Sequence, residues 1–466
     1  MELSRAGRPF VVVERAAAVG GLSRTRLVTE GEYTFRTDTG PHRFFSKNAY
    51  LYEFIGGLLE ERWIVVRRQT RQYIDGQFFD YPVNAGQVLR NLGPVKVARV
   101  LWDYAIAQVQ YSIFRRPIRH FKDFAYANFG RTLAEFNIIN YTEKVWGVST
   151  ESLHQDWAGQ RISGLNIVSV GWNLIRRALG GGAGGPKSLV DEFYYPDCGT
   201  GLIYETIRER IESAGNPVHL EAWPTRVSHA DGRVTAITLN DGREIAVDQL
   251  VESVHITDFV QLMDPPPPPE VIAAATGLRY RHQVYLFLTL DRESVTADQW
   301  IYFPKPEVPF DRWSEMRNFS ARMSPAGKTS LFIEFFCFPE DAKWSMSAEE
   351  LLALVLPVAE AGKFFTRAEV RHAYKFSGGK DYPLYDLEYR ERLAVVQRWL
   401  DGFSNLYNIG RPGRFKYTNQ DHSLEMGMLA AWSIVDGKRR DIGAVGSEGE
   451  YFEKGAVPTA TRNAPR

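Results

Sequence analysis

The stretch Val11–Thr25, VVVERAAAVGGLSRT, joins three consecutive valines to an acidic residue and then to a glycine pair. A β-branched run that ends in an acid is typical of the second strand of a dinucleotide-binding βαβ unit, where the carboxylate accepts hydrogen bonds from an adenosine ribose. Glu14 would be that carboxylate. The stretch also fits an ordinary surface strand that happens to end in an acid, so on its own it leaves both interpretations open.

The phosphate-binding turn that normally precedes such a strand is missing from this sequence. In a GxGxxG unit the acid follows the glycines by about 20 residues, whereas only the 13 residues MELSRAGRPFVVV precede Glu14. The segment ELSRAG suits the last turn of the helix that would follow the glycine turn, with Gly7 as its left-handed cap and Pro9 beyond it. We therefore expect a motif that begins midway. Three explanations fit the missing turn: the start of the chain is misplaced, the sequence is truncated, or ligand binding is impaired. We favour a truncated sequence.

The composition is that of an ordinary globular protein. The chain has 466 residues, of which 44% are hydrophobic and 24% charged, enough to bury a large core in two or three packed units. The 56 Lys and Arg residues equal the 56 Asp and Glu residues in number, which argues against a global attraction for nucleic acid or anionic membranes. Cys198 and Cys337 lack metal-ligand spacing and fit a reducing compartment, so we expect a cytoplasmic protein without a metal site.

The longest apolar helical stretch, VARVLWDYAIAQVQYSIF, runs from Val97 to Phe114 and is interrupted by Arg99 and Asp103. These charges argue against an integral membrane segment. We interpret the stretch as an amphipathic core helix. A membrane-surface role is the alternative, and we disfavour it because the polar face lacks the lysines that such helices use.

Turn signals divide the rest of the chain into strand-rich and helical blocks. NAYLYEFIGGLLEE is typical of a helix, and RRQTRQYIDGQFFDYP is typical of a hairpin that turns at Asp75 and Gly76. Helical spacing continues from about Gly86 to Leu179, and the following GGGAGGPKS fits a flexible connection better than a phosphate cradle. Strands then alternate with Asp-Gly turns as far as the five prolines at 265–269, which indicate a boundary.

These blocks predict an α/β protein in which a dinucleotide-binding domain is interrupted twice. The Rossmann-like domain would comprise residues 1–70, 197–270 and 400–466. A helical insertion would occupy residues 85–190. A mixed β-sheet substrate domain would combine residues 71–84 and 275–395.

Two segments carry residues suited to a planar or anionic ligand. In NIGRPGRFKYTNQDHS, Gly410 and Gly413 form a turn before a predicted helix, whose N-terminus suits an electron-rich flavin ring or a phosphate, although capping alone would explain Asp421. In GPHRFFS, His42 follows Gly40, which permits close approach of a planar ligand. A buried histidine with a purely structural role is the equal alternative.

Two arginines stand beside aromatic residues in different blocks. Arg161 follows Trp146 and Trp157, and Arg312 follows Tyr302. Arginine forks bind diphosphate oxygens in a bidentate manner, and aromatic rings stack on nucleobases. Each arginine alone fits a surface or interdomain salt bridge better. No Ser-His-Asp, HExxH or paired-cysteine pattern supports hydrolytic or zinc chemistry.

Taken together, these stretches resemble the flavin-dependent UDP-galactopyranose mutases, especially the eukaryotic type and its bacterial relatives, within the amine oxidase and protoporphyrinogen oxidase superfamily. The glycine motif near Gly20 is shared by the whole superfamily, whereas the spacing from Trp146 to Arg161 is more specific to the mutases. The resemblance is carried, in family order over most of the chain, by ERAAAVGGLSRT, GPHRFF, FFDYPVN, KVWGVST, WAGQR, FYYPDCGTGLIYE, YFPKPEVPFDRW, DYP and GRPGRFKYTNQDHS.

The resemblance implies a Rossmann-like FAD-binding domain and a reaction on a nucleotide-diphosphate sugar. Reduced FAD would attack the sugar through N5, UDP would leave, and the sugar of the resulting adduct would open and reclose with a different ring size. Arg161 and Arg312 would stabilise the diphosphate, with Arg161 on a mobile flap, and His42 would lie beside the isoalloxazine. The other substrate-binding residues would be Tyr81, Asn84, Trp146, Tyr302, Tyr382, Tyr417 and Asn419. The cofactor would be held by Glu14, Gly20, Gly21, Leu22, His42, Val227, Arg411 and Gln420.

Three positions depart from the family pattern. The sequence has Thr142 where the eukaryotic mutases carry Asn, Phe319 where they carry Tyr, and Asn84 in place of Gln. Each change removes or shortens a polar group near the expected substrate. The resemblance therefore implies a nucleotide diphosphate more strongly than UDP-galactose itself.

Our leading hypothesis is a cytoplasmic FAD enzyme that acts on a nucleotide sugar for surface polysaccharide synthesis, with NAD(P)H or a reduced flavin as reductant. The alternative is an FAD-dependent oxidoreductase of the amine oxidase or protoporphyrinogen oxidase type. A third hypothesis is a scaffold that has lost its cofactor. None of the three involves nucleic acid or an integral membrane segment, and the sequence does not define the oligomeric state.

Overall fold

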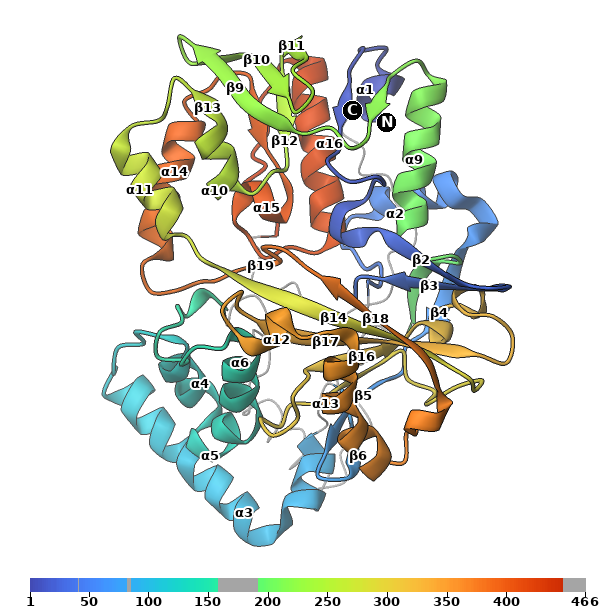
Figure 1. Ribbon diagram of the computed structural model, residues 1–466. Coiled ribbons are helices and arrows are strands. Elements are labelled where there is room, and N and C mark those ends of the chain that lie inside the picture. The colour runs from blue at the N-terminus through green and yellow to red at the C-terminus, as the bar shows by residue number, and fades with distance from the viewer. Residues whose placement is uncertain (41, 82–84, 158–191, 447–466) are drawn as a thin grey trace.

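An eight-stranded mixed sheet crosses the middle of the molecule (Figure 1). The computed structural model describes residues 1–40, 42–81, 85–157 and 192–446. The strand order is β18-β14-β17-β16-β15-β5-β6, with β19 paired to the start of β14, and only β15 and β5 are parallel. The strands are β5 (Thr70–Ile74), β6 (Gln77–Asp80), β14 (Tyr280–Leu290), β15 (Trp300–Tyr302), β16 (Arg312–Glu315), β17 (Thr329–Cys337), β18 (Val370–Ser377) and β19 (Tyr382–Pro383).

Both faces of this sheet are covered, because alternate residues of a strand point to opposite faces. Leu286 and Leu288 of β14 belong to one apolar cluster, which is packed against α13 (Ala348–Ala361). Tyr285 and Phe287 belong to a second cluster on the other face. That second cluster is completed by strands β2 (Thr25–Glu30), β3 (Tyr33–Asp38), β4 (Trp63–Arg67) and β7 (Glu192–Pro196).

The hairpin predicted around Asp75 and Gly76 is confirmed. β5 and β6 pair antiparallel with Ile74 opposite Gln77, and both turn residues have positive φ, 51° and 80°. This combination is the one that a two-residue hairpin turn requires. The parallel pairing of β5 with β15 then attaches the hairpin to the large sheet.

The segments expected to form the dinucleotide-binding domain supply a second group of sheets. Parallel pairs form between β1 (Val12–Val13) and β8 (Val218–His219), and between β12 (Leu250–Glu252) and β20 (Leu406–Asn408). The expected Asp-Gly turns join β9 (Pro224–Ala230), β10 (Arg233–Leu239) and β11 (Glu244–Ala246), and β13 (Met263–Asp264) completes that sheet. The predicted α/β fold class is confirmed, whereas the proposed domain boundaries stay a prediction.

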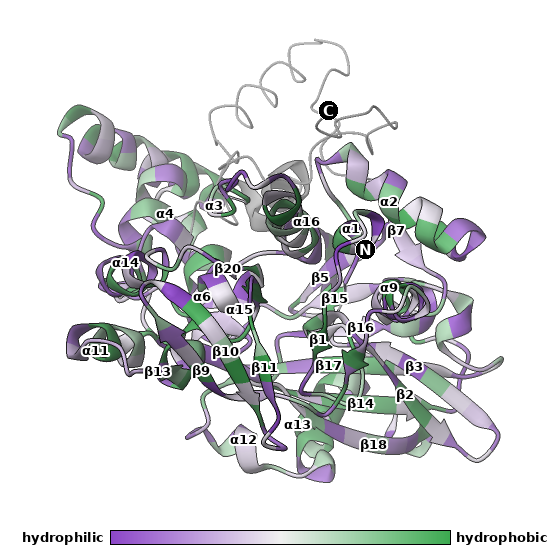
Figure 2. Cartoon of the chain, turned by 90° about the horizontal axis from the view of Figure 1, so that it is seen from above, coloured by the Kyte–Doolittle hydropathy of each residue, from purple (hydrophilic) through white to green (hydrophobic). Residues whose placement is uncertain are grey.

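Helices surround these sheets, and α2 shows apolar and polar residues side by side along its length, as a half-buried helix requires (Figure 2). The helices of this part are α1 (Glu2–Arg5), α2 (Ala49–Leu59), α9 (Gly201–Ser213), α10 (Ile256–Phe259), α11 (Pro269–Gly277), α12 (Ala342–Ser345), α14 (Tyr389–Leu400), α15 (Gly410–Arg414) and α16 (Gln420–Asp436). Short 3-10 turns lie at η1 (Gly21–Ser23), η2 (Glu60–Arg62), η5 (Val260–Leu262), η6 (Met316–Asn318), η7 (Ala321–Met323) and η8 (Arg367–Glu369).

The described part of the helical block differs from expectation at its outer helix. The block comprises α3 (Ala85–Gln108), η3 (Val109–Ile113), α4 (Phe121–Phe129), α5 (Arg131–Leu133), η4 (Ala134–Ile139) and α6 (Asn140–Trp146), of which η3 and η4 are π-helical. Val100 and Ala107 are buried on the inner face, but Trp102 on the outer face is 68% exposed. The prediction of a core helix is therefore wrong for the outer face of α3, because that face is exposed. Apolar residues occur around the whole helix, so periodicity did not define which stripe faces the core.

A buried carboxyl group joins the two parallel strands β12 and β20. The side chain of Glu252 accepts hydrogen bonds from the Asn408 amide and, at 2.8 Å, from the backbone N–H of Val254. An added Cβ on Gly413 would lie 3.1 Å from Glu252 Oε1, so α15 packs directly on this group. Burial raises the pKa of Glu252 from 4.5 to about 8.

This raised pKa predicts that the free energy of unfolding depends on pH, and that Glu252→Gln changes this dependence. A carboxyl whose pKa is raised by folding holds its proton in the folded state, so its contribution is complete below pH 4.5 and is lost as the pH rises through 8. Relative to the parent protein, Glu252→Gln should gain on the order of 3 kcal/mol of unfolding free energy between pH 5 and pH 8. Urea unfolding at both pH values measures this difference. The exposed variant Glu244→Gln is the control, and the same pH response in both variants would contradict the account.

Candidate functional site

The centre of the site is one row of residues that crosses the large sheet. Tyr302 of β15 lies opposite Arg312 of β16, and Arg312 lies opposite Glu334 of β17. Arg312 donates from Nε to Oε1 of Glu334 at 2.8 Å and from Nη2 to Oε2 at 2.7 Å. The guanidinium also lies 5.6 Å from the centre of the Tyr302 ring. The nearby carboxylate raises the pKa of Arg312 well above its usual value despite burial, so the arginine stays charged.

Two residues of β14 extend the hydrogen-bond network of this ion pair. Gln283 donates from Nε2 to Oε2 of Glu334 at 3.2 Å, and the hydroxyl of Tyr285 donates to Oε1 of Gln283 at 2.9 Å. Glu334 and Gln283 were missed by sequence reasoning. Their signal was present, since each is a polar residue within a long apolar strand, TSLFIEFFC and YRHQVYLFLTL, where a buried polar group requires a partner.

Arg411 of α15 reaches the same region from another segment. It donates from Nε and Nη2 to the carbonyl of Thr418, at 3.0 and 2.7 Å, and from Nη1 to the carbonyl of Asp381 at 3.2 Å. Its guanidinium lies 5.0 Å from the ring centre of Tyr382 and 4.8 Å from that of Tyr417. The arginine therefore fixes the loop before α16 and presents a positive charge beside two aromatic rings.

Aromatic residues from three segments form a continuous wall. Tyr382 and Tyr417 stack with ring centres 5.6 Å apart, and Trp146 packs edge-on against Trp157 at 4.6 Å. Trp157 contacts Tyr417 at 5.3 Å, and Trp146 contacts Tyr382 at 6.3 Å. These four residues form one cluster, and three of them, Trp146, Tyr382 and Tyr417, are among the predicted substrate-binding residues. Such a wall offers flat apolar surface to a planar ligand.

A second aromatic pair stands next to the ion pair. The rings of Tyr81 and Tyr302 lie 4.7 Å apart, and Tyr141 of α6 contacts Tyr302 edge-on at 6.2 Å. Tyr81 comes from the end of the β5–β6 hairpin and Tyr302 from β15. The structure thus brings Tyr81 together with Tyr302 and Arg312, which lie far from it in the sequence.

His42 lies at the same centre, beside the end of β3. Burial lowers its pKa to about 4, and the charges of Arg411 and Arg312 act in the same direction. The imidazole is therefore neutral near pH 7, so that one ring nitrogen can donate a hydrogen bond and the other can accept one. Gly40 passes so close to the ion pair that an added Cβ would lie 3.1 Å from Oε1 of Glu334.

Several buried polar atoms around this centre fit a polar, planar cofactor. Within the described residues, Nε2 of His42, Nε1 of Trp146, Oδ2 of Asp381, Oγ1 of Thr418 and both amide atoms of Gln420 have no hydrogen-bond partner. A buried polar group left unpaired costs about 1–3 kcal/mol. Such a concentration of unpaired groups beside the N-terminus of the 17-residue helix α16 is what a flavin ring with several donors and acceptors would satisfy.

The other predicted cofactor residues lie on separate elements. Glu14 follows β1 and accepts a hydrogen bond from the backbone of Ala16 at 2.7 Å. Gly20 has φ 104° and introduces the turn η1, which contains Gly21 and Leu22. The Leu22 backbone lies near the His42 ring, which connects this turn to the central cluster. Val227 is fully buried in the large apolar core that also contains Trp146 and Trp157.

The remaining predicted positions have mixed outcomes. Asn419 caps the N-terminus of α16, where its backbone N–H donates to Nδ1 of His422 at 3.2 Å. Arg161 and Asn84 lie outside the described residues. Thr142 is buried in α6, and Phe319 stacks on Trp300 in a core cluster rather than on the aromatic wall.

No helix in the described part of the chain is long and apolar enough to cross a membrane. In residues 1–40, 42–81, 85–157 and 192–446 there is also no cluster of three or more histidine, cysteine or acidic side chains suited to a metal ion.

Comparison with known proteins shows the same architecture elsewhere. The structure of reduced UDP-galactopyranose mutase matches with a TM-score of 0.81 and 20% sequence identity, over 96% of this chain and 93% of that chain. Cyclohexylamine oxidase from Brevibacterium oxydans matches with a TM-score of 0.64 and 14% identity, over 94% and 96% of the two chains. A putrescine oxidase variant matches with a TM-score of 0.62 and 14% identity, over 93% and 95%. These similarities show the fold.

The mixed α/β fold and the buried site with its unpaired polar groups define a flavin-dependent enzyme. The family model described as flavin containing amine oxidoreductase matches residues 1–361. The chain belongs to this family, and the predictions of a flavin cofactor and of the amine oxidase superfamily are confirmed.

The close approach at Gly40 predicts a specific cost for Gly40→Ala. The residue has φ 94°, and the new methyl group would press on Glu334. Gly31 is the matched control, because it also has positive φ, 61°, but its added Cβ would meet open space. Both variants bear backbone strain, and Gly40→Ala should lose about 1–2 kcal/mol more than Gly31→Ala in urea unfolding. Equal losses would show that the ion pair does not depend on this contact.

Proposed function

We propose that this protein is an FAD-dependent enzyme that acts on a nucleotide-diphosphate sugar and isomerises its ring in the manner of UDP-galactopyranose mutase. The observation that carries the proposal is Arg312, a buried arginine that Glu334 orients beside aromatic rings. A fixed guanidinium of this kind suits a diphosphate, and it has no evident use in a site for an apolar amine.

The geometry of Arg312 leaves one donor group for the ligand. Nε and Nη2 bind Glu334, and among the described residues no acceptor contacts Nη1. Because Gln283 and Tyr285 hold Glu334, the arginine has little freedom to rotate. A preorganised donor stabilises charge on a leaving diphosphate without reorganisation during the reaction. Arg161 would be the second arginine on this diphosphate.

The aromatic residues would bind the nucleotide. We assign the pocket for the base to Tyr81, Trp146 and Tyr302, and the approach to the diphosphate to Tyr382 and Tyr417. Asn84 and Asn419 would contact the substrate, the latter near the flavin. Enclosure by these rings excludes water from a reactive sugar, which would otherwise be hydrolysed.

FAD in its reduced form would supply the electron-rich ring that such a reaction requires. His42, Arg411 and Gln420 would surround the flavin. Glu14, Gly20, Gly21, Leu22 and Val227 would hold its adenosine and diphosphate. NAD(P)H or a reduced flavin would supply electrons, and we place the enzyme in the cytoplasm, in the synthesis of surface polysaccharide.

The rival function is oxidation of an amine or a polycyclic compound, since the family includes such enzymes. The two functions differ in what the flavin does. An oxidase passes electrons from substrate to acceptor at each turnover, whereas the proposed isomerisation leaves the redox state unchanged. Bleaching of the oxidised flavin by an amine, with no response to UDP-sugars, would favour the oxidase.

The proposal predicts that Arg312→Ala weakens UDP binding to the dithionite-reduced holoenzyme at least tenfold, because a hydrogen bond between charged groups contributes about 1.5–3 kcal/mol. Isothermal titration calorimetry with UDP measures the loss. Arg317→Ala is the matched control, because Arg317 also pairs with a carboxylate, Glu293 at 2.8 Å, but contacts no residue of the aromatic wall in the described chain. Equal UDP affinity of Arg312→Ala and the parent enzyme would overturn the diphosphate assignment.

A further inference from the structure

The outer face of α3 and η3 is apolar and exposed. Figure 1 shows α3 along the lower edge of the molecule, with α4, α5 and α6 on its inner side. Val95 is 82% exposed, Trp102 68% and Ile113 70%, and Ile106 and Val109 are about two-fifths exposed. Their spacing of seven, four, three and four residues places all five on one helical face. We call these five residues the α3 face.

A surface of this kind normally has a partner. The inner side of α3 is already packed, since Val100 and Ala107 are buried and Gly130 lies so close to Tyr104 that an added Cβ would be 2.6 Å from its backbone nitrogen. The α3 face is therefore not the core-facing stripe of this helix. Exposed contiguous apolar side chains on a folded protein mark interaction sites.

The charged residues within the segment that carries the α3 face are mostly basic. Residues 95–119 contain five basic residues and a single acidic residue, Asp103. Asp103 accepts hydrogen bonds from the backbone and hydroxyl of Thr132 in the neighbouring helix α5. The five basic residues, all exposed, are Lys96, Arg99, Arg115, Arg116 and Arg119.

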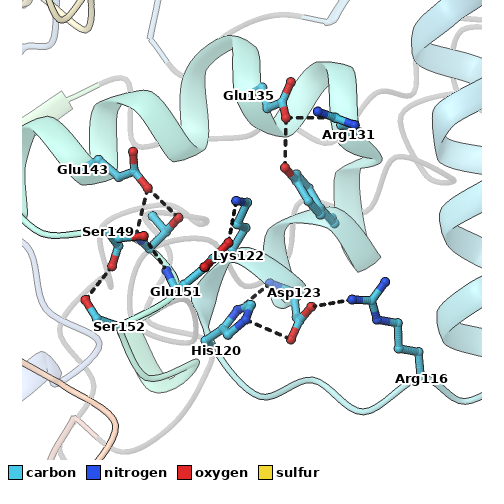
Figure 3. A network of polar contacts seen from close by, with 12 residues as sticks. Arg116, His120, Lys122, Asp123, Arg131, Glu135, Glu143, Ser149, Glu151 and Ser152 are labelled. Carbon is cyan, nitrogen blue, oxygen red and sulfur yellow. Dashed lines mark hydrogen bonds and ion pairs between the residues drawn. The ribbon is translucent and has the colours of Figure 1, made fainter.

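At the C-terminal end of the α3 face, exposed apolar residues are followed directly by basic residues. Phe114 is 77% exposed and is followed directly by Arg115 and Arg116. Figure 3 shows Arg116 directed toward Asp123, and the ion pair measures 3.8 Å. This contact positions the basic segment beside the α3 face without burying it.

A hollow of about 310 Å³ lies on the flank of α3. Lys96 and Arg99 line it together with the apolar residues Val100, Leu133 and Phe136. Glu135 also lines it, but Figure 3 shows Glu135 directed toward Arg131, at 2.9 Å, and the carboxylate also accepts a hydrogen bond from Tyr126. Two basic side chains above an apolar floor suit a phosphate group that bears acyl chains.

A second copy of this chain is a poorer occupant of the face. In a two-fold arrangement of antiparallel helices, Arg115 and Arg116 of one copy would approach Lys96 and Arg99 of the other. No acidic residue of the 95–119 segment except Asp103 could compensate, and Asp103 is already bonded to Thr132. Like charges across such an interface disfavour association.

We propose that the α3 face, with Phe114 and the flanking arginines, is a docking surface for an anionic lipid membrane. The apolar side chains enter the boundary between headgroups and acyl chains, and the basic residues contact lipid phosphates. Arginines provide the positive charge that lysines provide in other interfacial helices. This inference is independent of the reaction proposed above, since no residue of the α3 face belongs to the flavin site.

The test is co-sedimentation of the full chain with vesicles of phosphatidylcholine, with and without 30% phosphatidylglycerol. The protein should sediment with the anionic vesicles only, and 0.5 M NaCl should reduce the bound fraction. Trp102→Ser combined with Phe114→Ser should lower the affinity at least tenfold, as should Arg115→Gln combined with Arg116→Gln and Arg119→Gln. Absence of the protein from the anionic pellet would overturn the proposal.

The controls are matched exposed residues away from α3. Trp223→Ser removes a tryptophan that is 41% exposed, and Arg243→Gln removes an exposed arginine, so both should bind vesicles like the parent protein. Thermal unfolding verifies that each variant is folded. Mass photometry supplies the competing outcome, because a dimer that Trp102→Ser converts to monomer, without vesicle binding, would identify a second copy as the occupant.

Discussion

The buried ion pair between Arg312 and Glu334 is the interaction on which the site depends. Two charges inside a sheet are stable only when their geometry is good and their remaining polar atoms are bonded. The antiparallel register of β16 and β17 sets the pair face to face, and Gln283, itself held by Tyr285, donates to the carboxylate from the next strand. Removal of Glu334 alone would leave a buried positive charge without a partner.

The rest of the site is arranged around this pair by chain segments that come from distant parts of the sequence. The turn at Gly40 brings His42 to the pair from one side, and α15 brings Arg411 from another. Glu334 balances the charge of Arg312, and Arg411 adds a further positive charge beside the neutral histidine. Such a centre suits an anionic ligand and an electron-rich ring, and both features are required by a flavin enzyme that uses a nucleotide diphosphate.

Local sequence signals predicted local structure well. Asp75 and Gly76 defined a hairpin because only a few residue types accept positive φ at both turn positions. The row from Tyr302 to Glu334 was not predictable in the same way, because it depends on which strands pair and in which register. The resemblance supplied Arg312 but not Glu334, whose signal was a lone carboxylate in an apolar strand. The periodicity of residues 97–114 predicted a helix correctly, but it did not predict that one face of this helix is exposed. Apolar residues occur all around the helix, so the sequence does not reveal which side is packed.

Product analysis tests the central claim most directly. The dithionite-reduced holoenzyme is incubated with UDP-galactose or UDP-glucose, and the nucleotide sugars are separated by anion-exchange chromatography and weighed by mass spectrometry. The account predicts a new UDP-sugar of unchanged mass and altered retention, formed only with reduced flavin. Unchanged UDP-sugars, together with bleaching of the oxidised flavin by an amine, would contradict it.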